Sequence, residues 1–76
     1  MKEKVKSIMS VVFEIPVKQI DDELSPDTLK SWDSLKHMNL VAALEEEFNV
    51  EFSDGEIPLL SIYSSIITIL SEKINR

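Results

Sequence analysis

The sequence contains no cysteine, one histidine and one glycine, and its aromatic residues make up 7% of the 76 positions. Without cysteine no disulfide and no thiolate metal site can form, and His37 alone cannot build a zinc centre. No apolar run approaches the ~20 residues that span a membrane, and residues 1–16 lack the apolar region and cleavage site of a signal peptide. We therefore expect one cytoplasmic domain, residues 1–76, mature as written.

The chain is acidic, because 14 aspartate and glutamate residues against 8 lysine and arginine residues give a net charge of −6. Lys2, Lys4 and Lys6 fall at the start, so the remainder is more acidic still. Such a surface repels nucleic-acid phosphates and attracts proteins with basic patches. Apolar residues make up 43% of the chain, which argues against intrinsic disorder. We expect a folded domain whose partners are proteins and not nucleic acids.

The spacing of apolar residues near the N-terminus is helical. Val5, Met9 and their apolar neighbours recur at intervals of three and four residues. This first helix should end near Glu14, because Pro16 pushes the residue before it out of the α region. Residues 16–32 contain two prolines and several acids, which predicts a long loop. Loops of this length are uncommon in small domains and are often functional.

A second helix should follow, because residues 33–48 combine good helix formers with an apolar stripe. The stripe comprises Leu35, Met38, Val41, Ala42, Leu44 and Phe48, widened by Leu40. Ser53 and Glu56 have the spacing of a capping box, but Pro58 makes any helix there short. A last helix should begin near Ser61. The sequence thus predicts an all-α fold, a small irregular four-helix bundle of three main helices plus one short third helix, with a long loop between helices 1 and 2.

Asp33 and Ser34 stand where the second helix should begin. Both are favoured N-cap residues, and an acid suits the positive end of the helix dipole, so capping alone explains them. With His37 they also supply the residue types of a nucleophilic triad. Asp33 is adjacent to Ser34, however, and so small a bundle leaves little room for a substrate pocket and an oxyanion hole. We expect a protein that is not itself an enzyme.

Asp33-Ser34-Leu35 is followed by "MNLVAALEEEFNVEF" through residue 52, and this segment resembles the acyl carrier protein family. The resemblance covers nearly the whole chain. It implies that Ser34 carries 4'-phosphopantetheine, attached from coenzyme A by a holo-synthase (a phosphopantetheinyl transferase), and that Asp33 and Leu35 complete the cofactor-binding motif. Asp33 would help the holo-synthase and its Mg²⁺ engage the site, while no resident metal is implied. The arm would hold an acyl group as a thioester.

The resemblance implies two further sets of residues. The acyl chain would lie between helices against residues that can equally be ordinary core, namely Met38, Val41, Ala42, Ile57, Leu60 and Ile66. Acyl-loading and acyl-using enzymes with basic patches would dock on a second set, namely Lys36, His37, Glu45, Glu46, Glu47, Glu51, Asp54 and Glu56. We expect a monomer, because a carrier presents one face to several enzymes in turn.

Three residues beside the motif depart from the familiar fatty-acid carriers. Trp32 stands where those have a small residue, and Lys36 and His37 stand where acids are expected. This pattern resembles stand-alone carriers of specialised pathways, such as polyketide, modified-lipid or surface-polysaccharide assembly, and Trp32 should pack the loop onto the core. Two alternatives stay open: a peptidyl or aminoacyl carrier, and a helical interaction domain in which Ser34 only caps a helix.

Overall fold

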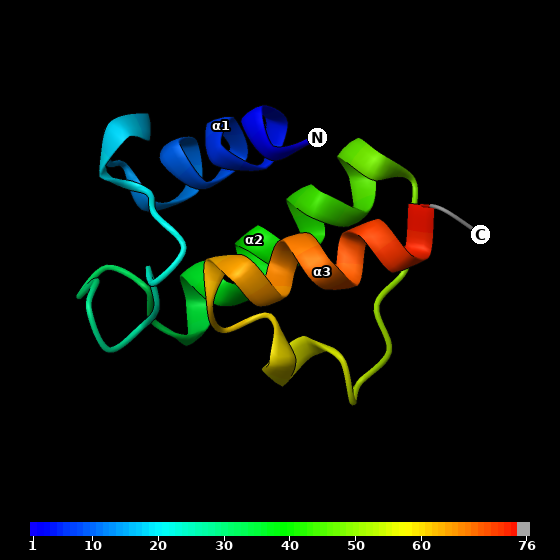
Figure 1. Cartoon of the computed structure of the whole chain (residues 1–76). Helices are drawn as coiled ribbons and strands as arrows, with labels where there is room; N and C mark the ends of the chain where they lie inside the picture. Colours follow the sequence, from blue (N-terminus) through cyan, green and yellow to red (C-terminus); the bar gives the residue numbers. More distant parts are fainter. Residues whose placement is uncertain (75–76) are drawn as a thin grey trace.

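The computed structural model describes residues 1–74, and the last two positions of the expected domain lie outside the described residues. Residues 1–74 form helices and turns and contain no strand, which confirms the all-α prediction. The elements along the chain are α1 (Lys2–Phe13), η1 (Val17–Gln19), α2 (Ser34–Phe48), η2 (Ile57–Leu59) and α3 (Tyr63–Ile74), where η denotes a 3₁₀ turn. Figure 1 shows α3 between α1 and the segment that contains η2.

Helix α1 ends as the proline predicts. Its C-cap, Glu14, adopts the left-handed conformation with φ of 58°, and the N–H of Glu14 donates to the carbonyl oxygen of Ser10. Pro16 then carries the chain into η1 in an extended conformation. Val5 and Met9 are buried at successive turns of α1, which places its apolar side against the core.

Helix α2 turns only part of the predicted apolar stripe to the core. Its buried residues are Leu40, Val41 and Leu44. Three members of the predicted stripe are instead exposed, namely Leu35, Met38 and Ala42. At 100° per residue these three positions lie opposite Leu40 on the helix, so one packed face cannot hold both sets. The predicted stripe is therefore buried in part and exposed in part.

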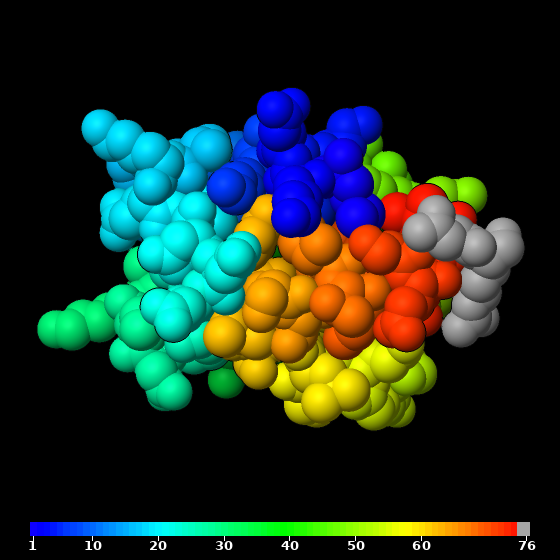
Figure 2. Space-filling model, viewed as in Figure 1, coloured from blue at the N-terminus to red at the C-terminus, as the bar shows by residue number. Residues whose placement is uncertain are grey.

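The segment between α1 and α2 is tied to the core by four buried side chains, those of Ile20, Leu24, Leu29 and Trp32. The backbone also contributes, because the N–H of Tyr63 in α3 donates to the carbonyl oxygen of Leu24 at 3.1 Å. In Figure 2 this segment covers one end of the molecule, beside α1 and α3. The residues before α2 are therefore held by packing as well as by the chain.

One of the two hydrogen bonds of the predicted capping box is present, because the N–H of Ser53 donates to Oε1 of Glu56 at 2.9 Å. The N–H of Glu56 donates to the backbone carbonyl oxygen of Ser53 and not to its hydroxyl. The helical segment that follows is the single 3₁₀ turn η2, which contains Pro58. It is short, as Pro58 predicts. Helix α3 begins at Tyr63, two residues after the expected Ser61. Its core side presents Tyr63, Ile66 and Leu70, all of which are buried.

Candidate functional site

The start of α2 is capped by Asp33 and not by Ser34. Oδ1 of Asp33 accepts a hydrogen bond from the backbone N–H of Lys36 at 2.8 Å, which is the N-cap geometry. Ser34 is the first residue of the helix and its side chain is exposed. From the sequence, either Asp33 or Ser34 could be the N-cap, and in the structure the N-cap is Asp33. Capping therefore does not account for a serine at position 34.

Trp32 anchors this helix start to the core. Its side chain is 4% exposed, and its ring lies 4.7 Å from that of Phe13, centroid to centroid. The hydroxyl of Ser31 also donates to the carbonyl oxygen of Phe13 at 3.3 Å. Trp32 thus packs the loop onto the core, as predicted, and Ser34 projects from a fixed position two residues later.

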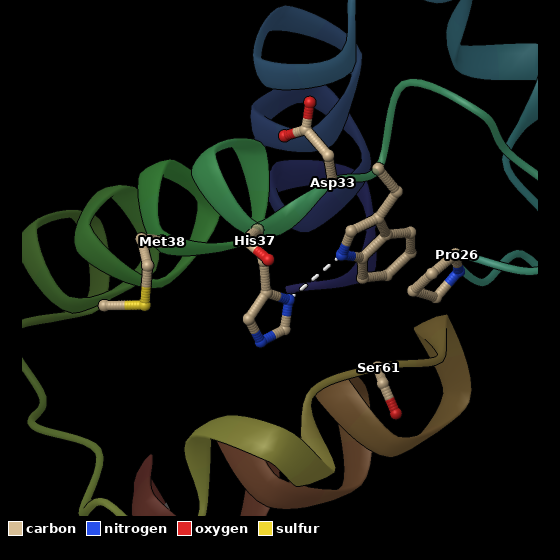
Figure 3. A pocket seen from close by; sticks show the side chains of 7 residues that line it. Pro26, Asp33, His37, Met38 and Ser61 are labelled. Atoms are coloured by element: carbon tan, nitrogen blue, oxygen red, sulfur yellow. Dashed lines mark hydrogen bonds between the residues drawn. The ribbon is translucent and has the colours of Figure 1, made fainter.

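His37 joins three segments of the chain. Nε1 of Trp32 donates a hydrogen bond to Nδ1 of His37 at 3.0 Å, the dashed line in Figure 3. Nε2 of His37 lies 2.9 Å from the carbonyl oxygen of Ile57 in η2. Because Nδ1 accepts, the ring proton sits on Nε2, which donates to that carbonyl. Sequence reasoning missed this arrangement, and the sequence holds no signal for it beyond the presence of both ring types.

A cavity of about 550 Å³ lies beside Ser34. It is lined by Pro26, Trp32, Asp33, Ser34, His37, Met38 and Ser61. Figure 3 shows His37 and Met38 on the α2 side of this space and Ser61 on the side that leads into α3. Pockets of 300–1,000 Å³ commonly hold small molecules in proteins. The exposed serine therefore opens onto a space large enough for an organic group.

Comparison with known proteins identifies the family to which the chain belongs. A family profile described as "Phosphopantetheine attachment site" matches residues 3–70. The chain is 33% identical over 73 residues to the acyl carrier protein of Buchnera aphidicola subsp. Schizaphis graminum, covering 96% of this chain and 92% of that protein. The chain belongs to the acyl carrier protein family. The acyl carrier protein of Thermosynechococcus vestitus is 32% identical over 72 residues, covering 95% of this chain and 89% of that protein.

Acyl carrier proteins carry a covalently attached 4'-phosphopantetheine. The residues around Ser34 fit this group. The hydroxyl is exposed at the first residue of α2, where a helix leaves N–H groups without intrahelical partners, and a phosphodiester is well placed at such an end. The adjoining cavity gives the organic part of the arm a surface to lie against.

The six residues predicted to line an acyl pocket in this carrier fall in three places. Val41, Leu60 and Ile66 are buried in the core, each at most 3% exposed. Ile57 is half-buried in η2. Met38 and Ala42 are exposed on α2, and of the six it is Met38 that lines the cavity beside Ser34.

Several of the acids predicted to dock partners already bind groups of the acyl carrier domain itself. Oε2 of Glu45 accepts from the N–H of Phe52 at 2.9 Å. Glu56 lies 2.8 Å from Nζ of Lys73. The hydrogen bond from Lys73, followed by that from the N–H of Ser53, lowers the pKa of Glu56 below its ordinary 4.5.

Other predicted docking residues form ion pairs or are exposed. Glu47 lies 3.7 Å from Nζ of Lys4, and Lys36 lies 3.4 Å from Glu14. Three acids are exposed, namely Glu46, Glu51 and Asp54. The exposed surface next to Ser34 also includes Leu35, which is 69% exposed, and Met38, which is 51% exposed.

The geometry around Ser34 is not that of a nucleophilic triad. Trp32 and Ile57 engage the two ring nitrogens of His37, and the Asp33 carboxylate binds the N–H of Lys36. Among the residues that the structure describes, no three metal-ligating side chains gather closely enough to hold an ion. No helix within residues 1–74 combines the length and apolar character that crossing a bilayer requires.

Proposed function

We propose that Ser34 is the attachment point of the 4'-phosphopantetheine arm, and that this chain is a non-catalytic carrier. The observation that supports this most is the division of roles at the start of α2. Asp33 caps the helix, while Ser34 is exposed beside a cavity. A serine that only capped the helix would occupy the position that Asp33 holds. A hydroxyl free of that role and open to solvent is available to a modifying enzyme.

The arm supplies a thiol that holds the acyl group as a thioester. The chain contributes the rest of the function. The N-terminus of α2 places positive potential at the phosphodiester, and packing of Trp32 on Phe13 holds that helix end in place. Asp33 is exposed and helps the holo-synthase and its metal engage the site, in addition to capping.

Partner enzymes dock on the side of α2 that carries Ser34. Leu35 and Met38 offer apolar contact there, as exposed apolar groups commonly do at interaction sites. The exposed acids further along the chain, such as Glu46, attract basic patches. Trp32 and His37 lie beside the motif, and these residue types differ from those of the familiar fatty-acid carriers. The difference favours a role in a specialised pathway, such as polyketide assembly, over a housekeeping role in fatty-acid synthesis.

We further propose that residues 1–76 form one monomeric, cytoplasmic carrier domain that binds no nucleic acid. In this interpretation η2 corresponds to the short third helix of a four-helix carrier fold, and the segment between α1 and α2 is the long first loop. The partners are the holo-synthase and the enzymes that load and use the acyl group.

The proposal is tested with fluorescently labelled coenzyme A, Mg²⁺ and a broad-specificity holo-synthase. Label should pass to the wild-type protein and not to Ser34→Ala. Subsequent loading with acyl-activating and aminoacyl-activating enzymes then separates an acyl carrier from a peptidyl or aminoacyl carrier. Absence of label on the wild type would instead support a helical interaction domain.

A further inference from the structure

The position of His37 bears on which cargo the carrier can shelter. Its ring projects from α2 toward η2 and is held from both sides, by the indole of Trp32 at 3.0 Å and by the carbonyl of Ile57 at 2.9 Å. The first of these hydrogen bonds joins the segment before α2 to α2, and the second joins α2 to η2. Figure 3 shows the imidazole within the cavity, between α2 and the segment that carries Ser61.

Trp32 is the one core residue among those that line the cavity beside Ser34. Its lining includes Trp32 and His37 but none of the buried residues Val41, Leu60 and Ile66. Those three side chains pack among the other buried residues, and Leu60 and Ile66 are fully buried. The apolar interior is therefore separated from Ser34 by the hydrogen-bonded pair.

An alkyl chain that entered between α2 and η2 would have to displace the imidazole. Both hydrogen bonds of His37 would then break. The Trp32 N–H and the Ile57 carbonyl would lose their partners in a partly buried setting, which costs free energy that an apolar chain cannot return by hydrogen bonding. A chain short enough to stay within the cavity leaves both bonds intact.

We propose that the Trp32–His37 pair restricts this carrier to short acyl groups, which lie in the cavity beside Ser34, and excludes long alkyl chains from the core. His37 is thus a specificity-determining residue that acts by closing the route between α2 and η2. The inference rests on the proposed function, in which cargo is attached at Ser34.

The test attaches chains without any modifying enzyme, so that its outcome is independent of whether a holo-synthase accepts the protein. The sequence has no cysteine, so Ser34→Cys provides a single thiol. This variant is alkylated with butyl, octyl or dodecyl iodoacetamide. The thermal midpoint and the methyl NMR shifts of Leu60 and Ile66 are then recorded, since burial of each additional methylene in the core stabilises the fold.

In the Ser34→Cys background the midpoint should not rise from butyl to dodecyl, and the Leu60 and Ile66 methyl signals should stay unmoved. Adding His37→Ala should open the route, so that the midpoint rises with chain length and both sets of methyl signals shift. Asn39→Ala, an exposed change on the same helix, is the matched control and should behave like the parent. Trp32→Phe, which keeps a ring and removes the N–H, provides a second opening variant should His37→Ala fold poorly.

Two results would overturn the proposal. The first is a thermal midpoint that rises with chain length in the Ser34→Cys protein itself, together with shifted methyl signals of Leu60 and Ile66. The route between α2 and η2 would then already be open. The second is a thermal midpoint that does not change with chain length in folded His37→Ala or Trp32→Phe variants. His37 would then not be the residue that closes the route. Failure of enzymatic labelling at Ser34 would count against the proposed function and leaves this measurement unaffected.

Discussion

The indole N–H of Trp32 donates to Nδ1 of His37 at 3.0 Å, and the planes of the two rings are inclined by 24°. Trp32 precedes the N-cap of α2, and His37 lies near the start of that helix. The hydrogen bond between them therefore links the loop directly to α2. On its other side Trp32 packs on Phe13 at the end of α1. The helix start that carries Ser34 is therefore fixed by three separate parts of the chain.

Trp32→Ala should lower the free energy of unfolding by about 3–5 kcal/mol, because it removes a large buried ring and leaves a cavity beside Phe13. Trp32→Phe should cost less, because it keeps a packed ring and loses the hydrogen bond to His37. Urea denaturation followed by far-ultraviolet circular dichroism measures both. Val11→Ala, at a position 78% exposed, is the reference. A Trp32→Ala loss no greater than that of Val11→Ala would refute the anchoring role.

Asp33→Ala should reduce stability by about 1 kcal/mol, because the N–H of Lys36 loses its acceptor. Asp33→Asn should be nearly as stable as the wild type, because asparagine caps as well as aspartate. The asparagine variant should still be modified more slowly by the holo-synthase, since it lacks the negative charge. Denaturation curves and initial labelling rates measured side by side separate the two roles. Equal labelling rates for wild type and Asp33→Asn would limit Asp33 to capping.

Tyr63→Phe should leave the domain as stable as the wild type or more so. The Tyr63 hydroxyl is buried and has no hydrogen-bond partner among the described residues, so the wild type bears a desolvation cost that phenylalanine lacks. Thermal unfolding near neutral pH measures the difference. A clear loss of stability would show that the hydroxyl makes a contact that the structure does not contain.

Tyr63 should also make the fold sensitive to alkali. Burial, followed by the charge of Asp22, raises the pKa of Tyr63 above its ordinary 10.0. The folded state therefore favours the protonated phenol, so this contribution is fully present below pH 10.0 and is lost as the pH rises through the higher folded pKa. The stability of Tyr63→Phe should fall less steeply above pH 10.0. Because the chain has a single tyrosine, its ultraviolet titration reports the shift directly.

Glu56 should contribute to stability in the opposite pH range. Its hydrogen bonds with Lys73 and the N–H of Ser53 lower its pKa from 4.5, so its contribution is present above pH 4.5 and is lost as the pH falls through the lower folded pKa. Glu56→Gln should flatten the acid limb of the stability curve. Glu51→Gln, at an exposed acid, is the control. If the stability of the wild type and of Glu56→Gln fell equally steeply with decreasing pH, the role of the Glu56–Lys73 ion pair would be contradicted.

Local chemistry made several features predictable. Pro16 marked the end of α1, the Ser53–Glu56 spacing predicted the hydrogen bond from the Ser53 N–H to the Glu56 side chain, and Pro58 limited the helical segment after it. Each of these depends on backbone geometry within a few residues. The attachment motif is proposed on an equally local pattern, since Asp33, Ser34 and Leu35 are contiguous.

Features that depend on tertiary packing were not predictable. Helix α2 has apolar residues on two sides, and periodicity does not tell which side is buried. Leu35, Met38 and Ala42 were therefore assigned to the same apolar stripe as the buried Leu40, although they are exposed. The bonds of His37 to Trp32 and Ile57 depend on how the loop and η2 fold back onto α2.

Intact-mass measurement after incubation with coenzyme A, Mg²⁺ and a holo-synthase tests the carrier assignment most directly. Wild type and Ser61→Ala, a control that removes another serine lining the same cavity, should each gain the mass of one phosphopantetheinyl group. Ser34→Ala should gain none while keeping its folded circular dichroism spectrum. An unmodified wild type, or a Ser34→Ala protein that still gains the group, would contradict the assignment of Ser34 as the attachment site.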